Sequence, residues 1–358
     1  MNDTPLAAHR SLVLVVGAGA SKEVNLPVGE ELKQAIASTL GFRVENHVSV
    51  VGGDQRIVDV FNQLAQQPGN RQGDINPYLE AAALIRNAMP QAQSIDNFID
   101  SHREDPHIRQ CGKLAIVSCI LRAEAASSLW VDRSNIHNRI RFAELTDTWF
   151  TGLFQLIVQS CQREEVPDRL RKVAVISFNY DRCLEHFLHG ALQNYYSMSS
   201  DQATVTLREL DIFHPYGTVG PLPWTASSTG VEYGGWPESQ QLASLSTQIR
   251  TFTEGTDEAT SEIASIRSFL SSAQRVAFLG FAFHPLNLDL LYGPKLKQAR
   301  RNNCLVYATA LGLSDSDARL IARDLAFRGG YRAHNLSFHK GLTASQLFKE
   351  YSRSLSLQ

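Results

Sequence analysis

Several features are missing from this chain, and each absence removes a class of protein. The 358 residues include only 5 cysteines, and no two of them are spaced Cys-x-x-Cys. This argues against a zinc ribbon and suits buried free thiols in a reducing compartment. No apolar run approaches the length of a membrane span, and the basic flank and aliphatic run near the N-terminus are too short for a secretory signal. A formal net charge of −2 gives no general electrostatic reason to bind nucleic acid or an anionic membrane. We therefore expect a soluble, cytoplasmic protein that binds no metal, no nucleic acid and no membrane.

The chain also lacks a complete nucleotide-binding signature, although residues 12–21 come close to one. Leu12–Val16 predicts a strand buried on both faces, as in a parallel sheet. Gly17 and Gly19 would let the backbone turn sharply and let a ligand approach main-chain N–H groups, and a helix beginning there would favour a phosphate. However, Lys22 stands where a dinucleotide fingerprint has its third glycine, and there is no Walker loop. The segment indicates a nucleotide site, and the alternative that it is only a tight turn between a strand and a helix, with no ligand, remains open.

Strand and helix patterns alternate along most of the chain. Four buried strands are expected, at residues 11–16, 172–178, 275–281 and 304–309. Such alternation predicts an α/β fold: a Rossmann-like parallel sheet with a large helical insertion subdomain. Residues 1–45 and 166–358 would form the nucleotide-binding domain, and residues 46–165 the insertion. Residues 225–256 are rich in Ser, Thr and Gly, which is typical of a mobile loop near a site or a surface excursion.

Polar residues follow the second and third predicted strands. In an open parallel sheet, the carboxyl ends of the strands line the ligand crevice. Asn179 could hold a water or ribose hydroxyls there, whereas Asp181 could equally accept from a ribose hydroxyl or cap its helix. After the third strand, Gly280 would allow close backbone approach and Asn287 could reach a ligand, while Phe281 is more typical of packing.

A histidine stands in the turn at residues 212–218. His214 titrates near neutrality and could serve as a general base, although a lone histidine in a turn is usually structural. It becomes of interest because the other segments predict a nucleotide pocket. Asp96, in the insertion, could approach the crevice, but helix capping is favoured.

In this order, the segments resemble the sirtuin-like domains of bacterial anti-phage defence proteins. The resemblance rests on residues 17–21, 94–98, 177–181, 214–217 and 279–281 and extends over about residues 10–330. It implies that NAD is the substrate and is hydrolysed to nicotinamide and ADP-ribose. The chain has no zinc module with two cysteine pairs, so protein deacylation is not expected. Many such domains carry the catalytic histidine directly before the glycine at 217, where this chain has Tyr216.

The resemblance also implies roles for individual residues. Asn179 would position a water or the ribose hydroxyls, Asp181 would orient the ribose, and His214 would accept a proton. Residues of the glycine turn and three later segments would bind NAD: Gly17, Ala18, Gly19, Ala20, Ser21, Tyr216, Gly217, Gly280, Phe281 and Asn287.

Control by assembly is a further implication, because unchecked loss of NAD is toxic. The chain would form a homo-oligomer or act with a partner such as a HerA-type ATPase or an Argonaute-like protein. Two other functions remain open at this stage: a regulatory module that binds NAD or ADP-ribose without cleaving it, and an ADP-ribosyl transferase.

Overall fold

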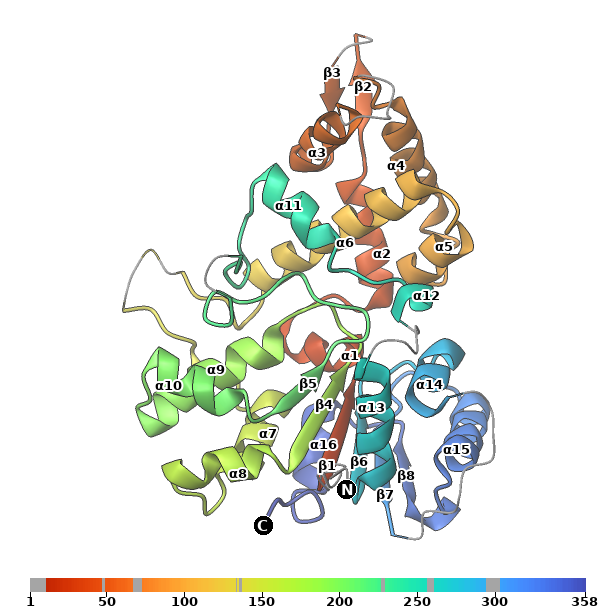
Figure 1. Cartoon of the computed structure of the whole chain (residues 1–358). Coiled ribbons are helices and arrows are strands. Elements are labelled where there is room, and N and C mark those ends of the chain that lie inside the picture. Colours follow the sequence, from red (N-terminus) through yellow and green to blue (C-terminus); the bar gives the residue numbers. More distant parts are fainter. Residues whose placement is uncertain are drawn as a thin grey trace, which may run out of the picture.

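The computed structural model describes residues 11–46, 49–66, 73–132, 134, 137–226, 229–255, 261–293 and 303–358. A lobe built around a sheet lies below a lobe made mostly of helices (Figure 1). The carboxyl ends of the central strands point toward the helical lobe, so loops that leave these strands lie between the two lobes (Figure 1).

The sheet has six strands, all of them parallel, in the order β5-β4-β1-β6-β7-β8. The strands are β1 (Leu12–Val16), β4 (Val173–Ser177), β5 (Asp211–Phe213), β6 (Arg275–Leu279), β7 (Leu305–Thr309) and β8 (Leu336–His339). The chain builds outward from β1 on one side and then returns to build outward on the other, which is the strand order of dinucleotide-binding sheets. The predicted α/β, Rossmann-like fold is confirmed, and the four predicted strands correspond to β1, β4, β6 and β7. The sequence missed β5 and β8, which are short and only half-buried.

Two apolar layers enclose the sheet, one on each face. Val13 and Val15 face one layer, whereas Leu12, Leu14 and Val16 face the other, and this double burial explains the unbroken aliphatic run of β1. The first layer is covered by α13 (Ser261–Ser272), α14 (Pro285–Tyr292) and α15 (Asp315–Gly329). The second is covered by α7 (Trp149–Val158), α8 (Val166–Leu170), α9 (Cys183–Tyr196), α10 (Ser200–Leu207) and α16 (Ala344–Glu350).

The helical lobe is organised around α6 (Pro106–Ala125), which is buried along most of its length. Around it lie α2 (Gly29–Thr39), α3 (Gln55–Ala65), α4 (Asn76–Ala88) and α5 (Ile95–Ser101), with a small hairpin of β2 (Arg43–Glu45) and β3 (Ser49–Val51) at the tip. The helical lobe differs from the predicted insertion, residues 46–165, because α2 packs on α6 whereas α7 packs on α9 and α16 beside the sheet.

The segment expected to be a mobile loop or surface excursion, residues 225–256, is largely part of the helical lobe. Its described residues include α11 (Ser239–Ser246) and α12 (Phe252–Gly255), and residues 227–228 and 256 lie outside the described part. Leu242 and Leu245 of α11 are buried against α3 and α6. Serine-rich composition therefore misled the prediction, because the segment also carries apolar residues, including these two leucines, that are buried.

All five cysteines are free thiols, and four of them are buried. Among the described residues, no helix combines the length and apolar character needed to cross a lipid bilayer.

Candidate functional site

Most of the predicted site residues lie at the carboxyl edge of the sheet, where it faces the helical lobe (Figure 1). Val16 of β1 pairs with Ser177 of β4 and with Leu279 of β6. The loops that follow these three strands therefore begin side by side. The segment after β5 joins them, because β5 pairs with β4.

Three buried polar side chains form a hydrogen-bonded group that we call the polar cluster: Ser21, Asn179 and Asp181. The Ser21 hydroxyl donates to Asp181 Oδ2 over 3.0 Å and accepts from Asn179 Nδ2 over 3.0 Å. The exposed fractions of the three residues are 2%, 7% and 8%. Ser21 ends the single turn of α1 (Ala18–Ser21). The cluster thus joins residues about 160 positions apart in the chain, through the loops of two adjacent strands.

Asp181 uses both of its carboxylate oxygens in hydrogen bonds within the protein, one of them at the start of the following helix. Its Oδ1 accepts from the Cys183 amide over 3.1 Å at the start of α9, while its Oδ2 belongs to the polar cluster. Burial raises the pKa of the Asp181 carboxyl, although hydrogen bonds from Cys183 and Ser21 oppose the rise.

His214 lies directly beside the polar cluster, as the predicted convergence requires. Its Nδ1 is 3.2 Å from the Asn179 carbonyl oxygen, and its Nε2 is 2.7 Å from Glu185 Oε1. Burial alone would lower the pKa of His214, but the charge and hydrogen bond of Glu185 outweigh it and raise that pKa. Burial likewise opposes ionisation of Glu185, and His214 outweighs it, so the pKa of Glu185 is lowered. Both ring nitrogens face oxygen acceptors, an arrangement that suits the imidazolium form.

Sequence reasoning missed Glu185. One signal could have found it. Glu185 lies in the first turn of the helix that follows Asp181, and residues four positions apart lie on the same side of a helix. Its partner, His214, lies 29 residues further along the chain, and no local pattern connects the two.

A cavity of about 10 Å³ lies among Ser21, Asn179, Asp181, Glu185 and His214. This volume is close to the minimum for a single water. A dinucleotide bound near the polar cluster would therefore have to lie outside this cavity, along the edge of the sheet.

The glycine turn is shaped by contact with the turn after β6. The Gly17 amide donates to the Leu279 carbonyl and the Gly19 amide to the Gly280 carbonyl, each over 3.0 Å. A Cβ on Gly17 would lie 2.6 Å from the Gly280 oxygen. A Cβ on Gly280, whose φ is +56°, would lie 2.0 Å from the Ala20 nitrogen. The Gly17 and Gly19 amides are therefore both used within the protein, so a ligand approaching this turn would have to use other main-chain N–H groups. Of the predicted turn, Gly19 is exposed and Ala18 half-exposed, whereas Gly17, Ala20 and Ser21 are buried.

Aromatic residues form a second group at the same edge. The Tyr216 ring packs on Phe178 with 5.6 Å between centroids, and Phe178 packs on Phe281 over 5.0 Å. The Tyr216 hydroxyl donates to Asn287 Oδ1 over 2.7 Å. Burial raises the pKa of the Tyr216 phenol, and the nearby Asp96 adds to the rise. Of the predicted ligand contacts, Tyr216, Phe281 and Asn287 therefore lie together.

Asp96 does not cap its helix, which is the role that the sequence favoured for it. Ser94 caps α5, accepting from the Asn97 amide over 3.0 Å, while the Asp96 carboxylate accepts a hydrogen bond from the Tyr180 hydroxyl. Burial raises the pKa of Asp96, against the effect of that bond. The pair links the helical lobe to the loop after β4, so the reading that favoured capping for Asp96 is wrong. Gly217, the remaining predicted residue, closes its own turn by donating to the His214 carbonyl over 2.9 Å.

A buried ion pair also fixes this loop to the helical lobe. Arg182 Nη2 donates to Glu124 Oε2 over 2.5 Å, and the two side chains are 2% and 0% exposed. The guanidinium further donates to main-chain carbonyls of segment 220–232, including Val231 over 2.6 Å. Nothing in the sequence predicted this pair.

Within the described ranges, no three His, Cys, Asp or Glu side chains are grouped so that they could hold a metal ion. Neither a protein-family model nor a curated protein sequence matches the chain.

Proposed function

We propose that the chain is a sirtuin-like hydrolase that cleaves the nicotinamide–ribose bond of NAD to release nicotinamide and ADP-ribose. One observation carries the proposal: the polar cluster and His214 come from separate segments and meet at the carboxyl edge of the sheet. Ligands of open α/β sheets bind outside this edge, at the point where the strand order reverses. Here that point lies between β1 and β6, beside the exposed Gly19.

The bond to be broken needs little acid catalysis. Nicotinamide leaves with the bonding electron pair as a neutral molecule, and the ribose carbon becomes oxocarbenium-like until a water adds to it. An enzyme helps mainly by holding the nucleotide and by placing one water at the exposed face of the sugar. In the proposal, Asn179 positions this water or the ribose hydroxyls and Asp181 orients the ribose. Asn179 suits the role because its Nδ2 is held by Ser21, while its Oδ1 accepts no hydrogen bond within the described part of the chain.

His214 accepts the proton that the attacking water loses. Only the neutral imidazole can do this, and Glu185 would then hold the remaining ring N–H. Because the pKa of His214 is raised, a larger share of these rings carries a charge near neutrality than for an exposed histidine. We therefore expect the rate of nicotinamide release to rise with pH through the pKa of His214.

The experiment is to incubate the purified full chain with NAD and measure nicotinamide by chromatography. Asn179→Ala should reduce the rate at least about 100-fold, the lower range for loss of a positioned polar group. Asn62→Ala is the matched control, since Asn62 is exposed on α3 of the helical lobe. Unchanged turnover in Asn179→Ala would remove Asn179 from the scheme. Absence of nicotinamide release from the wild-type chain at all protein concentrations would refute hydrolysis by the chain alone.

One observation favours a second candidate, a module that binds NAD or ADP-ribose without cleaving it. Both ring nitrogens of His214 already face protein oxygens, so the ring can take a proton from a water only if one of these contacts opens. Thermal stabilisation by NAD, without nicotinamide release, would support this candidate over the hydrolase.

The proposal includes control by assembly, through self-association or a partner such as a HerA-type ATPase or an Argonaute-like protein. Its support is chemical: an enzyme that consumes NAD must be restrained in its host. Specific activity should then increase with protein concentration or on addition of a partner, and a constant value would argue against self-association as the switch.

A further inference from the structure

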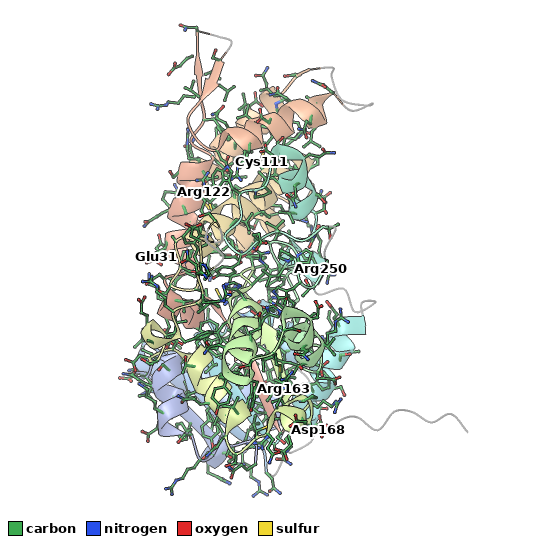
Figure 2. All side chains as sticks on the ribbon, turned by 90° about the vertical axis from the view of Figure 1, so that its left-hand side faces the viewer. Glu31, Cys111, Arg122, Arg163, Asp168 and Arg250 are labelled. Carbon is green, nitrogen blue, oxygen red and sulfur yellow. The ribbon has the colours of Figure 1, made fainter. Side chains whose placement is uncertain are left out.

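A second and much larger cavity, of about 900 Å³, lies on the flank of the sheet lobe. It is bounded by α9, by the start of α10 and by residues 131, 138–140, 142 and 223–224, on the side of the molecule that faces the viewer in Figure 2. None of the predicted site residues lines it. Its volume is within the range of small-molecule sites, roughly 300–1,000 Å³.

One wall of this cavity is formed by two stacked rings. The His189 and Trp224 rings are stacked, with centroids 4.2 Å apart and planes within 3° of parallel. Hydrogen bonds hold the imidazole from both sides: Nε2 is 3.1 Å from the Ser200 carbonyl oxygen, and Nδ1 is 3.1 Å from Gln193 Nε2. The wall therefore includes a flat aromatic surface that the protein's own hydrogen bonds support.

The indole of Trp224 also carries a polar atom with no partner. Its Nε1 is buried and makes no hydrogen bond to any residue that the structure describes. Buried donors are almost always paired. This unpaired donor beside the cavity is an observation independent of the cavity's size, and an acceptor atom on an occupant is the kind of group that would satisfy it.

The chemistry of the lining defines the occupant. Among the lining residues that the structure describes, none is Asp or Glu, and Arg139 is the one permanently charged side chain. The amides of Asn138, Gln193 and Asn194 can donate and accept at the edge of a nitrogen heterocycle. Arginine suits a phosphate, and an indole suits a planar ring.

We propose that this cavity binds a nucleotide, with the base against Trp224 and the phosphate at Arg139. The occupant would contact α9, the helix whose first turn carries Glu185. The proposal does not depend on NAD hydrolysis, because it concerns binding at residues outside the polar cluster.

The test measures binding of AMP, GMP, CMP and UMP, each separately, to the full chain by isothermal titration calorimetry. We expect at least one of them to bind with one site per chain. Arg139→Ala should weaken binding at least about tenfold, and Asn194→Trp should abolish it by filling the cavity from an exposed position. Arg141→Ala is the matched control, because Arg141 lies two residues away, is 72% exposed and does not line the cavity. Asn179→Ala should also leave binding unchanged.

Three results would overturn the proposal. The first is no binding of any of the four nucleotides at about 1 mM, the weak end of specific affinity. The second is binding that Asn179→Ala removes and Arg139→Ala does not, which would assign the nucleotide to the edge of the sheet. The third is a change of oligomeric state in Asn194→Trp without any nucleotide binding by the wild type, which would make the cavity a protein contact.

Discussion

Removal of the Arg182 side chain should destabilise the protein far more than removal of an arginine from its surface. Glu124 Oε1 accepts from Arg182 Nε over 3.1 Å and Oε2 from Nη2 over 2.5 Å, and Arg182→Ala removes both bonds. The carboxylate keeps two amide donors, those of Arg182 itself and Gly234. Because Glu124 is fully buried, the substitution leaves its charge without the counter-ion that the described residues provide, and breaking such a pair costs about 3–5 kcal/mol.

The measurement is the free energy of unfolding from urea titration at pH 7. Arg171→Ala is the matched control: Arg171 pairs with Asp168 and Glu209, but it is 49% exposed, so water screens these pairs and its loss should cost far less. A double variant in which Glu124→Gln accompanies Arg182→Met should recover part of the loss, because it removes both charges. Equal destabilisation by Arg182→Ala and Arg171→Ala would refute the argument that burial makes this pair important.

Two further predictions concern the edge of the sheet. Glu185→Gln should lower the pKa of His214, as followed by the NMR shift of its ring protons, and should destabilise the protein by about 1.5–3 kcal/mol, the range for a charged hydrogen bond. Because the pKa of His214 is raised in the folded protein, its protonated ring stabilises the fold. This contribution is fully present below the pKa of histidine in the unfolded chain, about 6.5, and is lost as pH rises through the folded pKa. Because the pKa of Glu185 is lowered in the folded protein, its ionised carboxylate also stabilises the fold. This contribution is present above the pKa of glutamate in the unfolded chain, about 4.3, and is lost as pH falls through the folded pKa. The decrease in the free energy of unfolding caused by Glu185→Gln should therefore be greatest near pH 4.3–6.5. A decrease that does not depend on pH would contradict the ion pair between His214 and Glu185. Gly280→Ala should cost at least about 1–3 kcal/mol, because φ is +56° and the added Cβ meets the Ala20 nitrogen. Gly341→Ala, where a Cβ meets nothing within 4 Å, is its control in thermal unfolding, and equal melting temperatures would argue against the close contact of the two turns.

Much of the sheet could be predicted because its signal is local. Leu12–Val16 and Val173–Ser177 are short runs of aliphatic residues that only a strand buried on both faces explains. Their alternation with helices implied parallel strands, and parallel strands bring their carboxyl ends to one edge. That reasoning was enough to expect Asn179 and His214 near the glycine turn, although the turn, the strand ends and the histidine are far apart in the chain.

Packing across long sequence separations decided the rest. The glycines of the turn indicated a close approach, but only the fold shows that the partner of Gly17 is the backbone at Gly280. Glu185 became the partner of His214, and Asp96 the partner of Tyr180, through contacts spanning 29 and 84 residues. A periodic pattern records which face of an element is buried, whereas the identity of a hydrogen-bond partner depends on how whole elements dock. For that reason the sequence by itself determined four of the six strands and the edge where the candidate site lies, and the tertiary structure alone decided which side chains pair there.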